Sequence, residues 1–478
     1  MVRLATRNIG FLLLLITPYL GAQTSVRFPA LEAEPQVYRY ARLENTWQAL
    51  TQISLWASGV KDAAEFEDII AEAVDSLRLN LPADPRERGS YILSFMHRRY
   101  LNAYSYHQTR LDTIFMTGQY NCVSSAVLYM ILAVSADLDV KGVITKDHAF
   151  IQLNTGLELI DVETTNPYGF DPGGRKEFHD GFGNITGFAY VPARNYRDRA
   201  TVSPLELISL ILSNRISELE STYRYNDSIP LAVNRTALLT GEANPVSSPL
   251  FPDPRQELID RLLYFGANLL NTGKTEEALR WFALTEDRYP DPRWQEFTYT
   301  AVNNLMAYLL GGRRIAEAWK VLREYTAHLS SDQVKQLTAM LTDFELVQAT
   351  TQIRTVGEAE NALAAIAEAQ GLLPARRIEE FRNFAVLKGA ELVAAEKGWA
   401  GAIAFTEAAA ARYGTNGALE NSLKVFRSNR IAELHNAFAD LYNRRDYEGA
   451  RAFIRQALAE FPDNRQLIAD RNLADKAR

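Results

Sequence analysis

The stretch Gly118-Gln-Tyr-Asn-Cys122-Val-Ser-Ser-Ala-Val-Leu-Tyr-Met-Ile-Leu-Ala133 decides how this chain folds. A turn-forming Gly-x-x-Asn leads directly into an apolar run, and the pattern predicts a helix that begins near Cys122. Cys122 is the only cysteine of the 478 residues. Unpaired N–H groups and the positive end of the helix dipole favour a thiolate at such a position. The stretch therefore indicates a candidate nucleophile.

The pattern of residues changes after this helix. Residues 140–145, 148–153 and 157–162 alternate in hydropathy and are rich in β-branched side chains, which is typical of strands. Asn154-Thr-Gly156 lies between the last two runs and predicts a hairpin turn. A helix followed by an antiparallel sheet is an α+β core.

Three residue types in this core occur in the order that thiol acyl transfer requires. Cys122 is followed by His148 in one predicted strand and by Asp161 in the next. A thiol–imidazole–carboxylate triad needs a nucleophile, a base and a group that orients the base. We therefore predict these three as the catalytic residues.

The carboxylate partner of His148 depends on the pairing of the two strands. Pairing about the predicted turn puts His148 roughly opposite Asp161 or Glu163, with one or two residues of uncertainty from the loop. We prefer Asp161, because Ile160 and Val162 would then pack on the opposite face. Glu163 shares the face of Asp161 and is the substitute candidate.

Other residues compete for two of the catalytic roles. His179, with Asp171 and Asp180 nearby, is a rival base, whereas His97 is expected to be solvated. The Cys122 backbone N–H is the expected oxyanion donor, with a second donor from Gln119, Tyr120 or Asn121.

The stretch from about Tyr91 to Phe170 resembles a bacterial transglutaminase-like cysteine protease domain of the papain-like thiol superfamily. The residues that carry the resemblance are Gly118-Gln-Tyr-Asn-Cys122-Val-Ser-Ser-Ala126-Val-Leu-Tyr129, Asp147-His148-Ala-Phe-Ile and Leu159-Ile-Asp161-Val-Glu-Thr-Thr165. The resemblance implies the roles of nucleophile, base and orienting acid for Cys122, His148 and Asp161. The chain has Gly-x-x-Asn-Cys where relatives more often carry Gly-Asn-Cys or Gly-x-Cys, which leaves the oxyanion donor open.

The first 22 residues resemble a secretory signal. Arg3 and Arg7 precede the short apolar run 10–17, and Ala22 is a small residue before a cleavage point. The run is too short to span a bilayer comfortably. We predict a periplasmic or secreted protein, with an uncleaved membrane anchor as the alternative, and no integral membrane domain.

The sequence after Ser203 is helical in pattern, and two stretches of it resemble tetratricopeptide repeats. The first has Gly266, Leu269, Gly273, Ala278, Phe282 and Pro290, and the second has matching positions at Ala450, Ile454, Ala457 and Pro462. Small residues at these positions allow two helices to cross closely. The alternative is a helical bundle without repeats.

The predicted organisation has six segments. They are a signal peptide (1–22), a helical lead-in (23–85), the transglutaminase-like domain (86–200), a helical hairpin extension (201–244), a linker (245–254) and tetratricopeptide-like repeats (255–478). Within the domain, residues 166–184 are predicted to be loop-like, and residues 187–192 a further strand.

Composition excludes some classes of function. The chain is 47% hydrophobic and 23% charged, with a net charge of −7 and interspersed charges, so nucleic-acid binding has no support. It has no His-x3-His or Cys-x2-Cys spacing, so we predict neither a metal nor a cofactor.

Two functions fit these observations. The first is an exported thiol enzyme that hydrolyses or transfers an amide of a peptide or protein substrate, with the repeats binding a protein or peptide. The second is an inactive enzyme fold whose repeats serve as a protein-binding scaffold. The triad favours the first. A lone thiol, which is exposed to oxidation outside the cytoplasm, favours the second.

Overall fold

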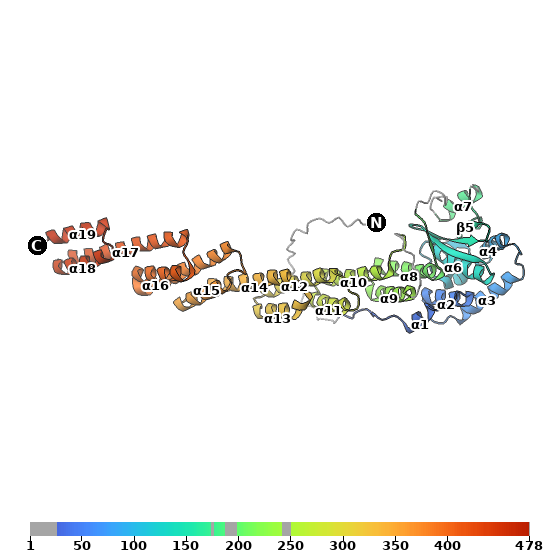
Figure 1. The fold of residues 1–478 in the computed structure, drawn as a ribbon, viewed down its shortest axis with the longest axis horizontal. Coiled ribbons are helices and arrows are strands. Elements are labelled where there is room, and N and C mark those ends of the chain that lie inside the picture. The colour runs from blue at the N-terminus through green and yellow to red at the C-terminus, as the bar shows by residue number, and fades with distance from the viewer. Residues whose placement is uncertain (1–25, 174–175, 187–197, 241–249, 478) are drawn as a thin grey trace. The chain divides into compact units, whose positions relative to one another are not determined.

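The computed structural model describes residues 26–477, except 174–175, 187–197 and 241–249 (Figure 1). The predicted signal peptide, the further strand at 187–192 and half of the predicted linker (245–249) lie outside the described residues. The chain divides into two compact units, residues 1–291 and 292–478. In the described part, no helix is both long and apolar enough to span a bilayer.

The first unit contains a small sheet and the helices around it. Its helices are α1 (Pro35–Tyr40), α2 (Trp47–Ser58), α3 (Ala64–Arg78), α4 (Pro85–Arg99), α5 (Leu111–Thr117), α6 (Cys122–Ser135), α7 (Lys176–Thr186), α8 (Pro204–Ser221), α9 (Tyr225–Leu239), α10 (Pro254–Asn271) and α11 (Thr275–Glu286). Its strands are β1 (Ala103–Tyr104), β2 (Gln119–Tyr120), β3 (Asp139–Ile144), β4 (Ala149–Asn154), β5 (Leu159–Val162) and β6 (Ala200–Val202).

The predicted α+β core is present. Strands β5, β4, β3 and β6 form an antiparallel sheet in that order. The predicted hairpin turn joins β4 to β5, and Gly156 adopts the left-handed backbone that such a turn requires (φ 83°). Asp161 pairs with Gln152 across these two strands. This register determines which carboxylate reaches His148.

Helix α6 is the centre of the core. It packs on β3 and β4 and also contacts α2, α4 and α8. Residues 123–133 are all buried, because a helix that is apolar on every side is covered on every side. Helix α7 contacts β1, which pairs with β2 directly before the start of α6.

One segment of this core differs from the prediction. Residues 166–184 were expected to be loop-like, but α7 occupies Lys176–Thr186. Gly181 and Gly183 suggested a loop, yet Phe178 and Phe182 are four residues apart and both are buried, so apolar packing outweighs the glycines. The predicted domain boundary at residue 200 falls inside β6, which pairs with β3.

The second unit is helical in its described residues. It contains α12 (Arg293–Gly311), α13 (Ile315–Tyr325), a 3-10 turn (Thr326–His328), α14 (Ser331–Thr351), α15 (Val356–Glu368), α16 (Ala375–Tyr413), α17 (Gly417–Asn443), α18 (Tyr447–Glu460) and α19 (Arg465–Lys476). Helix α16 is interrupted at Gly398, which has non-helical backbone angles. Successive helices pack against each other along the unit.

The same close helix crossing recurs at a spacing of 16 residues. A Cβ at Gly266 would lie 2.0 Å from Phe282 Cε1, and a Cβ at Gly389 would lie 2.6 Å from Phe405 Cε1. Ala278 of α11 is fully buried, and α11 packs against α10. Helical hairpins with small residues at their crossings are therefore present in both units. Their membership of the tetratricopeptide class remains a prediction.

Candidate functional site

Cys122 is the first residue of α6, as the sequence predicts. Asn121 precedes it, and its Oδ1 accepts hydrogen bonds from the backbone N–H of Val123 (3.0 Å) and Ser124 (3.0 Å). Ser124 Oγ in turn accepts from the backbone N–H of Asn121 (2.9 Å), which completes a capping box. The backbone N–H of Cys122 donates no hydrogen bond to an acceptor within the described residues.

The imidazole of His148 lies between Cys122 and a carboxylate. His148 Nε2 is 2.6 Å from Glu163 Oε2, and the two side chains are 13% and 3% exposed. Cys122 is close enough to His148 to influence the pKa of the imidazole. Since Glu163 occupies Nε2, Nδ1 is the ring nitrogen left for the thiol. The structure thus brings together a thiol, an imidazole and a carboxylate.

Two opposing effects act on the pKa of His148. Burial alone would lower it. The negative charge of Glu163, together with hydrogen bonds to Cys122 and Glu163, outweighs burial and raises the pKa well above its ordinary value. The site therefore favours an imidazolium, which is the partner that stabilises a thiolate.

The Glu163 carboxylate is held on both oxygens. While Oε2 faces His148, Oε1 accepts hydrogen bonds from the Thr165 hydroxyl (2.8 Å) and the Thr165 backbone N–H (3.3 Å). The Glu163 backbone N–H donates to Gly169 O (2.8 Å). A Cβ at Gly169 would lie 1.9 Å from Glu163 O. Only glycine allows this approach, and the carboxylate is oriented before any substrate binds.

The segment that carries Glu163 is attached to three other elements. His97 of α4 donates from Nε2 to Thr164 O (3.0 Å), Ser125 Oγ of α6 lies 2.8 Å from Thr164 Oγ1, and the Tyr120 hydroxyl of β2 donates to Thr165 O (3.1 Å). Residues 163–166 are buried. These contacts position Glu163 relative to the helix that carries Cys122.

His97 is not solvated, contrary to the prediction. It is partly buried, its ring meets that of Tyr120 edge to face, and burial lowers its pKa to about 4 despite the hydrogen bond to Thr164. The flanking Arg98 and Arg99 suggested an exposed face, and both are exposed. His97 lies one position earlier on the helix, which turns it toward the Thr164 backbone.

Asp161 does not reach His148, and the preference for it over Glu163 is wrong in this respect. Both of its oxygens pair with Arg199 (2.8 and 2.9 Å), and Oδ1 also accepts a hydrogen bond from Gln152 Nε2 (3.2 Å). The register places Asp161 opposite Gln152, four residues from His148 along the strand. At about 3.3 Å per residue, that offset is too large for a hydrogen bond. The substitute, Glu163, is the carboxylate at the imidazole.

Aromatic rings flank His148. Its ring stacks with Phe150 (centroids 6.3 Å apart) and meets Phe182 of α7 edge to face (5.8 Å). Phe182 packs in turn on Phe178. The predicted loop thus supplies a helix whose apolar side chains limit the access of water to the imidazole.

Among the predicted oxyanion donors, two side chains are already engaged. The Tyr120 hydroxyl donates to Thr165 O, and Asn121 Nδ2 donates to Tyr106 O. Gln119 is exposed, and no hydrogen bond joins its side chain to the described residues. Tyr104 of β1 was not predicted. Burial and the nearby charges of Cys122 and Glu163 raise its pKa, which keeps its hydroxyl protonated.

The rival base His179 lies in α7, and its side chain is outside the described residues. Asp171, one of its predicted companions, forms an ion pair with Arg86. Among the described residues, no group of three His, Cys, Asp or Glu side chains is arranged to hold a metal ion. The thiol, the imidazole and the Glu163 carboxylate are therefore the reactive groups of the site.

Comparison with known proteins adds no family to this geometry. No family model matches the chain, and no curated protein matches it.

Proposed function

We propose that this chain is an exported thiol enzyme that hydrolyses or transfers amides through Cys122, His148 and Glu163. The observation that carries the proposal is the pairing of His148 Nε2 with Glu163 Oε2 at 2.6 Å, with Cys122 close enough to influence the pKa of His148. Nucleophile, base and orienting carboxylate are the three groups that acyl transfer requires.

In the proposed mechanism, the Cys122 thiolate attacks the amide carbonyl carbon. The C–N bond then breaks, a thioester forms, and the His148 imidazolium gives its Nδ1 proton to the leaving amine. Neutral His148 next takes a proton from water or from a second amine, which attacks the thioester and releases the Cys122 thiolate, so the thiolate–imidazolium pair is restored. Glu163 keeps the ring oriented and stabilises its positive charge throughout.

The oxyanion of the tetrahedral intermediate needs donors beside Cys122. The Cys122 backbone N–H has no acceptor in the described residues and meets this need directly. The Tyr104 hydroxyl is a suitable second donor, since it is protonated and close enough to Cys122 for the thiolate charge to influence its pKa. Gln119, exposed and adjacent in sequence, is the alternative.

The rest of the chain supports a peptide or protein substrate. Helical hairpins with small residues at their crossings occur in both units, and stacked hairpins of this kind bind extended peptides and protein segments. We propose that they recruit the substrate or a partner protein, and that the protein is periplasmic or secreted.

The proposal is tested by labelling Cys122 with a fluorescent iodoacetamide across pH. Because it is the only cysteine, Cys122→Ser gives the blank. The intact protein should label rapidly at pH 6, where an ordinary thiol with a pKa of about 8.5 is almost fully protonated. His148→Ala should move the labelling profile to that of an ordinary thiol, with a loss of more than tenfold at pH 6.

Two carboxylate variants separate the proposed triad from the predicted one. Glu163→Gln should reduce labelling at pH 6, because the imidazolium loses its counter-charge. Asp161→Asn is the matched control two residues away, and it should label as the intact protein does. An unchanged profile in His148→Ala would reject the triad and favour a non-catalytic binding protein.

A further inference from the structure

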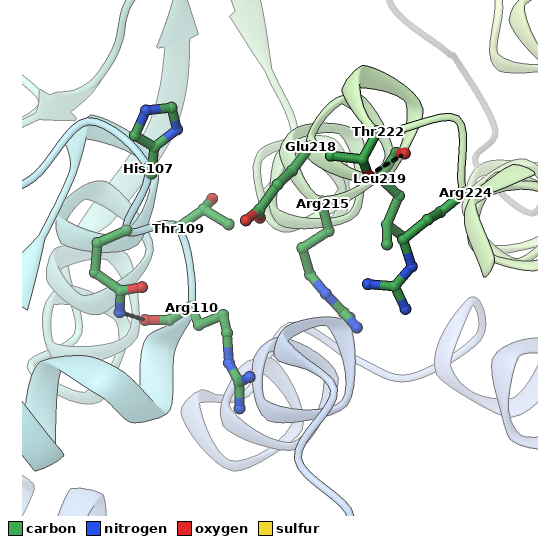
Figure 2. A pocket seen from close by; sticks show the side chains of 9 residues that line it. His107, Thr109, Arg110, Arg215, Glu218, Leu219, Thr222 and Arg224 are labelled. Atoms are coloured by element: carbon green, nitrogen blue, oxygen red, sulfur yellow. Dashed lines mark hydrogen bonds between the residues drawn. The ribbon is translucent and has the colours of Figure 1, made fainter.

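A second concave site lies in the first unit, apart from the three triad residues. Figure 2 shows this cavity, whose volume is about 420 Å³. It lies between the loop that follows β1 and the C-terminal half of α8 with the turn after it. The lining residues are His107, Gln108, Thr109, Arg110, Arg215, Glu218, Leu219, Thr222 and Arg224.

Positive charge predominates among the side chains that line this cavity. Arg110, Arg215 and Arg224 contribute three guanidinium groups, whereas Glu218 is the one carboxylate among the lining residues. In Figure 2 the three guanidinium groups are directed toward the same side of the cavity, and Glu218 points toward Thr109. The carboxylate therefore does not occupy the place where the cations gather.

Each arginine has N–H groups that form no hydrogen bond with the described residues. Arg110 uses Nε and Nη2 on Asp112, and Arg224 uses Nε and Nη2 on Asp227, so Nη1 is left in both. Arg215 donates from Nη1 to Ala57 O (2.5 Å), and Nε and Nη2 are left.

Arg215 is the least neutralised of the three. No carboxylate forms an ion pair with it in the described part of the chain, although Arg110 and Arg224 each have one. Burial and, to a smaller extent, the positive charge of Arg110 lower its pKa, and the negative charges of Asp112, Glu218 and Glu34 offset this only in part. A bound anion would relieve this repulsion.

We propose that this cavity binds a small phosphate-type oxyanion. Guanidinium groups from three separate positions line it, and each has N–H groups left to donate. A planar carboxylate is satisfied by one guanidinium fork, whereas a tetrahedral phosphate offers oxygens in several directions at once. The proposal does not depend on the proposed thiol chemistry.

The cavity shares its loop with the N-terminus of α6. Asn121 Nδ2 donates to Tyr106 O (3.2 Å), and Ser124 Oγ donates to Gln108 O (3.0 Å). Asn214 of α8 also donates to Thr109 Oγ1 (3.0 Å). An anion held between Arg110, Arg215 and Arg224 would therefore stabilise the loop that packs beside the Cys122 cap.

The test measures the affinity of the full chain for inorganic phosphate by calorimetry and by the shift in melting temperature, at constant ionic strength set with chloride. Phosphate should bind and stabilise the protein. Citrate and chloride should give much smaller shifts. Arg110→Gln and Arg224→Gln should each raise the phosphate Kd at least fivefold, whereas Glu218→Gln should lower it.

Arg376→Gln is the charge-matched control, because Arg376 is 92% exposed and lies in the second unit. It should leave the phosphate Kd unchanged. Circular dichroism without phosphate checks that each variant is folded. The proposal is overturned if phosphate stabilises no more than chloride, if citrate binds as tightly, or if Arg376→Gln weakens binding as much as Arg224→Gln.

Discussion

The candidate site of the first unit and the helical hairpins of the second unit satisfy their buried polar side chains in different ways. In the first unit, Thr164 bonds to Ser125, and Tyr120 bonds to Thr165, across 39 and 45 residues of sequence. In the second unit, the buried hydroxyls of Thr350 and Thr406 donate to carbonyls four residues earlier in their own helices. Long-range polar contacts therefore accompany the candidate site, and local ones accompany the helical hairpins.

This difference has a physical meaning. A hydroxyl that bonds to its own helix needs no partner element, so its contact forms whenever the helix forms. A hydroxyl that bonds across 40 residues is satisfied only when two elements are correctly docked, and it costs free energy when they are not. His435 and Asp470, 2.8 Å apart on α17 and α19, are an exception in the second unit.

The largest effect is expected at Gly169. Gly169→Ala places a Cβ against Glu163 O, where the gap is 1.9 Å, and should destabilise the first unit by at least about 3 kcal/mol. Gly156→Ala is the control, since its left-handed backbone costs about 1–2 kcal/mol and no atom lies within 4 Å. Scanning calorimetry measures both. Equal losses would show that the Glu163 segment can relax.

The next effect concerns His97 and pH. Folding holds its pKa at about 4, against 6.5 for an ordinary histidine. Its contribution is present above pH 6.5 and is lost as the pH falls toward 4, a change of roughly 3 kcal/mol. His97→Gln should flatten the dependence of unfolding free energy on pH in this window, while His107→Gln should not. An equal slope in His97→Gln would contradict the assignment.

The pKa of His148 shifts in the opposite direction to the pKa of His97. Its pKa is raised in the folded protein, so its contribution is present below the unfolded value and is lost as the pH rises through the folded one. The His97 measurement is therefore made as a difference between His97→Gln and the intact protein. The glutamine amide can still donate to Thr164 O, so the Glu163 segment keeps its position and the contribution of His148 cancels.

A smaller effect is expected in the helical hairpins. Ala450 of α18 is fully buried, and Ala450→Phe should overpack the crossing and cost about 1–3 kcal/mol. Ala452 is exposed on the same helix, so Ala452→Phe should change stability by no more than about 0.5 kcal/mol. An unchanged melting temperature in Ala450→Phe would remove the repeat interpretation of this segment.

The smallest effect tests the comparison of the units directly. Thr164→Val leaves Ser125 without its long-range partner and should cost about 1–2 kcal/mol. Thr350→Val removes only a bond to a carbonyl of its own helix and should cost less than about 1 kcal/mol. Thermal unfolding of the two variants measures the difference. A larger loss for Thr350→Val would show that the contrast between the units carries no energetic weight.

Local features of the site follow from the sequence by itself. The start of α6 at Cys122 follows from Asn121 and the apolar run, and the hairpin between β4 and β5 follows from Gly156 and the alternation around it. These features depend on residues a few positions apart, so local hydrogen bonding and side-chain periodicity are sufficient to predict them. The close crossing of α10 and α11 follows similarly from Gly266 and Ala278.

Only the tertiary structure decided which carboxylate orients His148. Alternation puts Asp161 and Glu163 on one face, but the register between β4 and β5 sets their distances, and a two-residue difference moves a side chain by about 7 Å. Arg199, which binds Asp161, lies 38 residues away from it, and the His97 contact with Thr164 spans 67. Such pairings arise when the elements dock, so no local pattern records them.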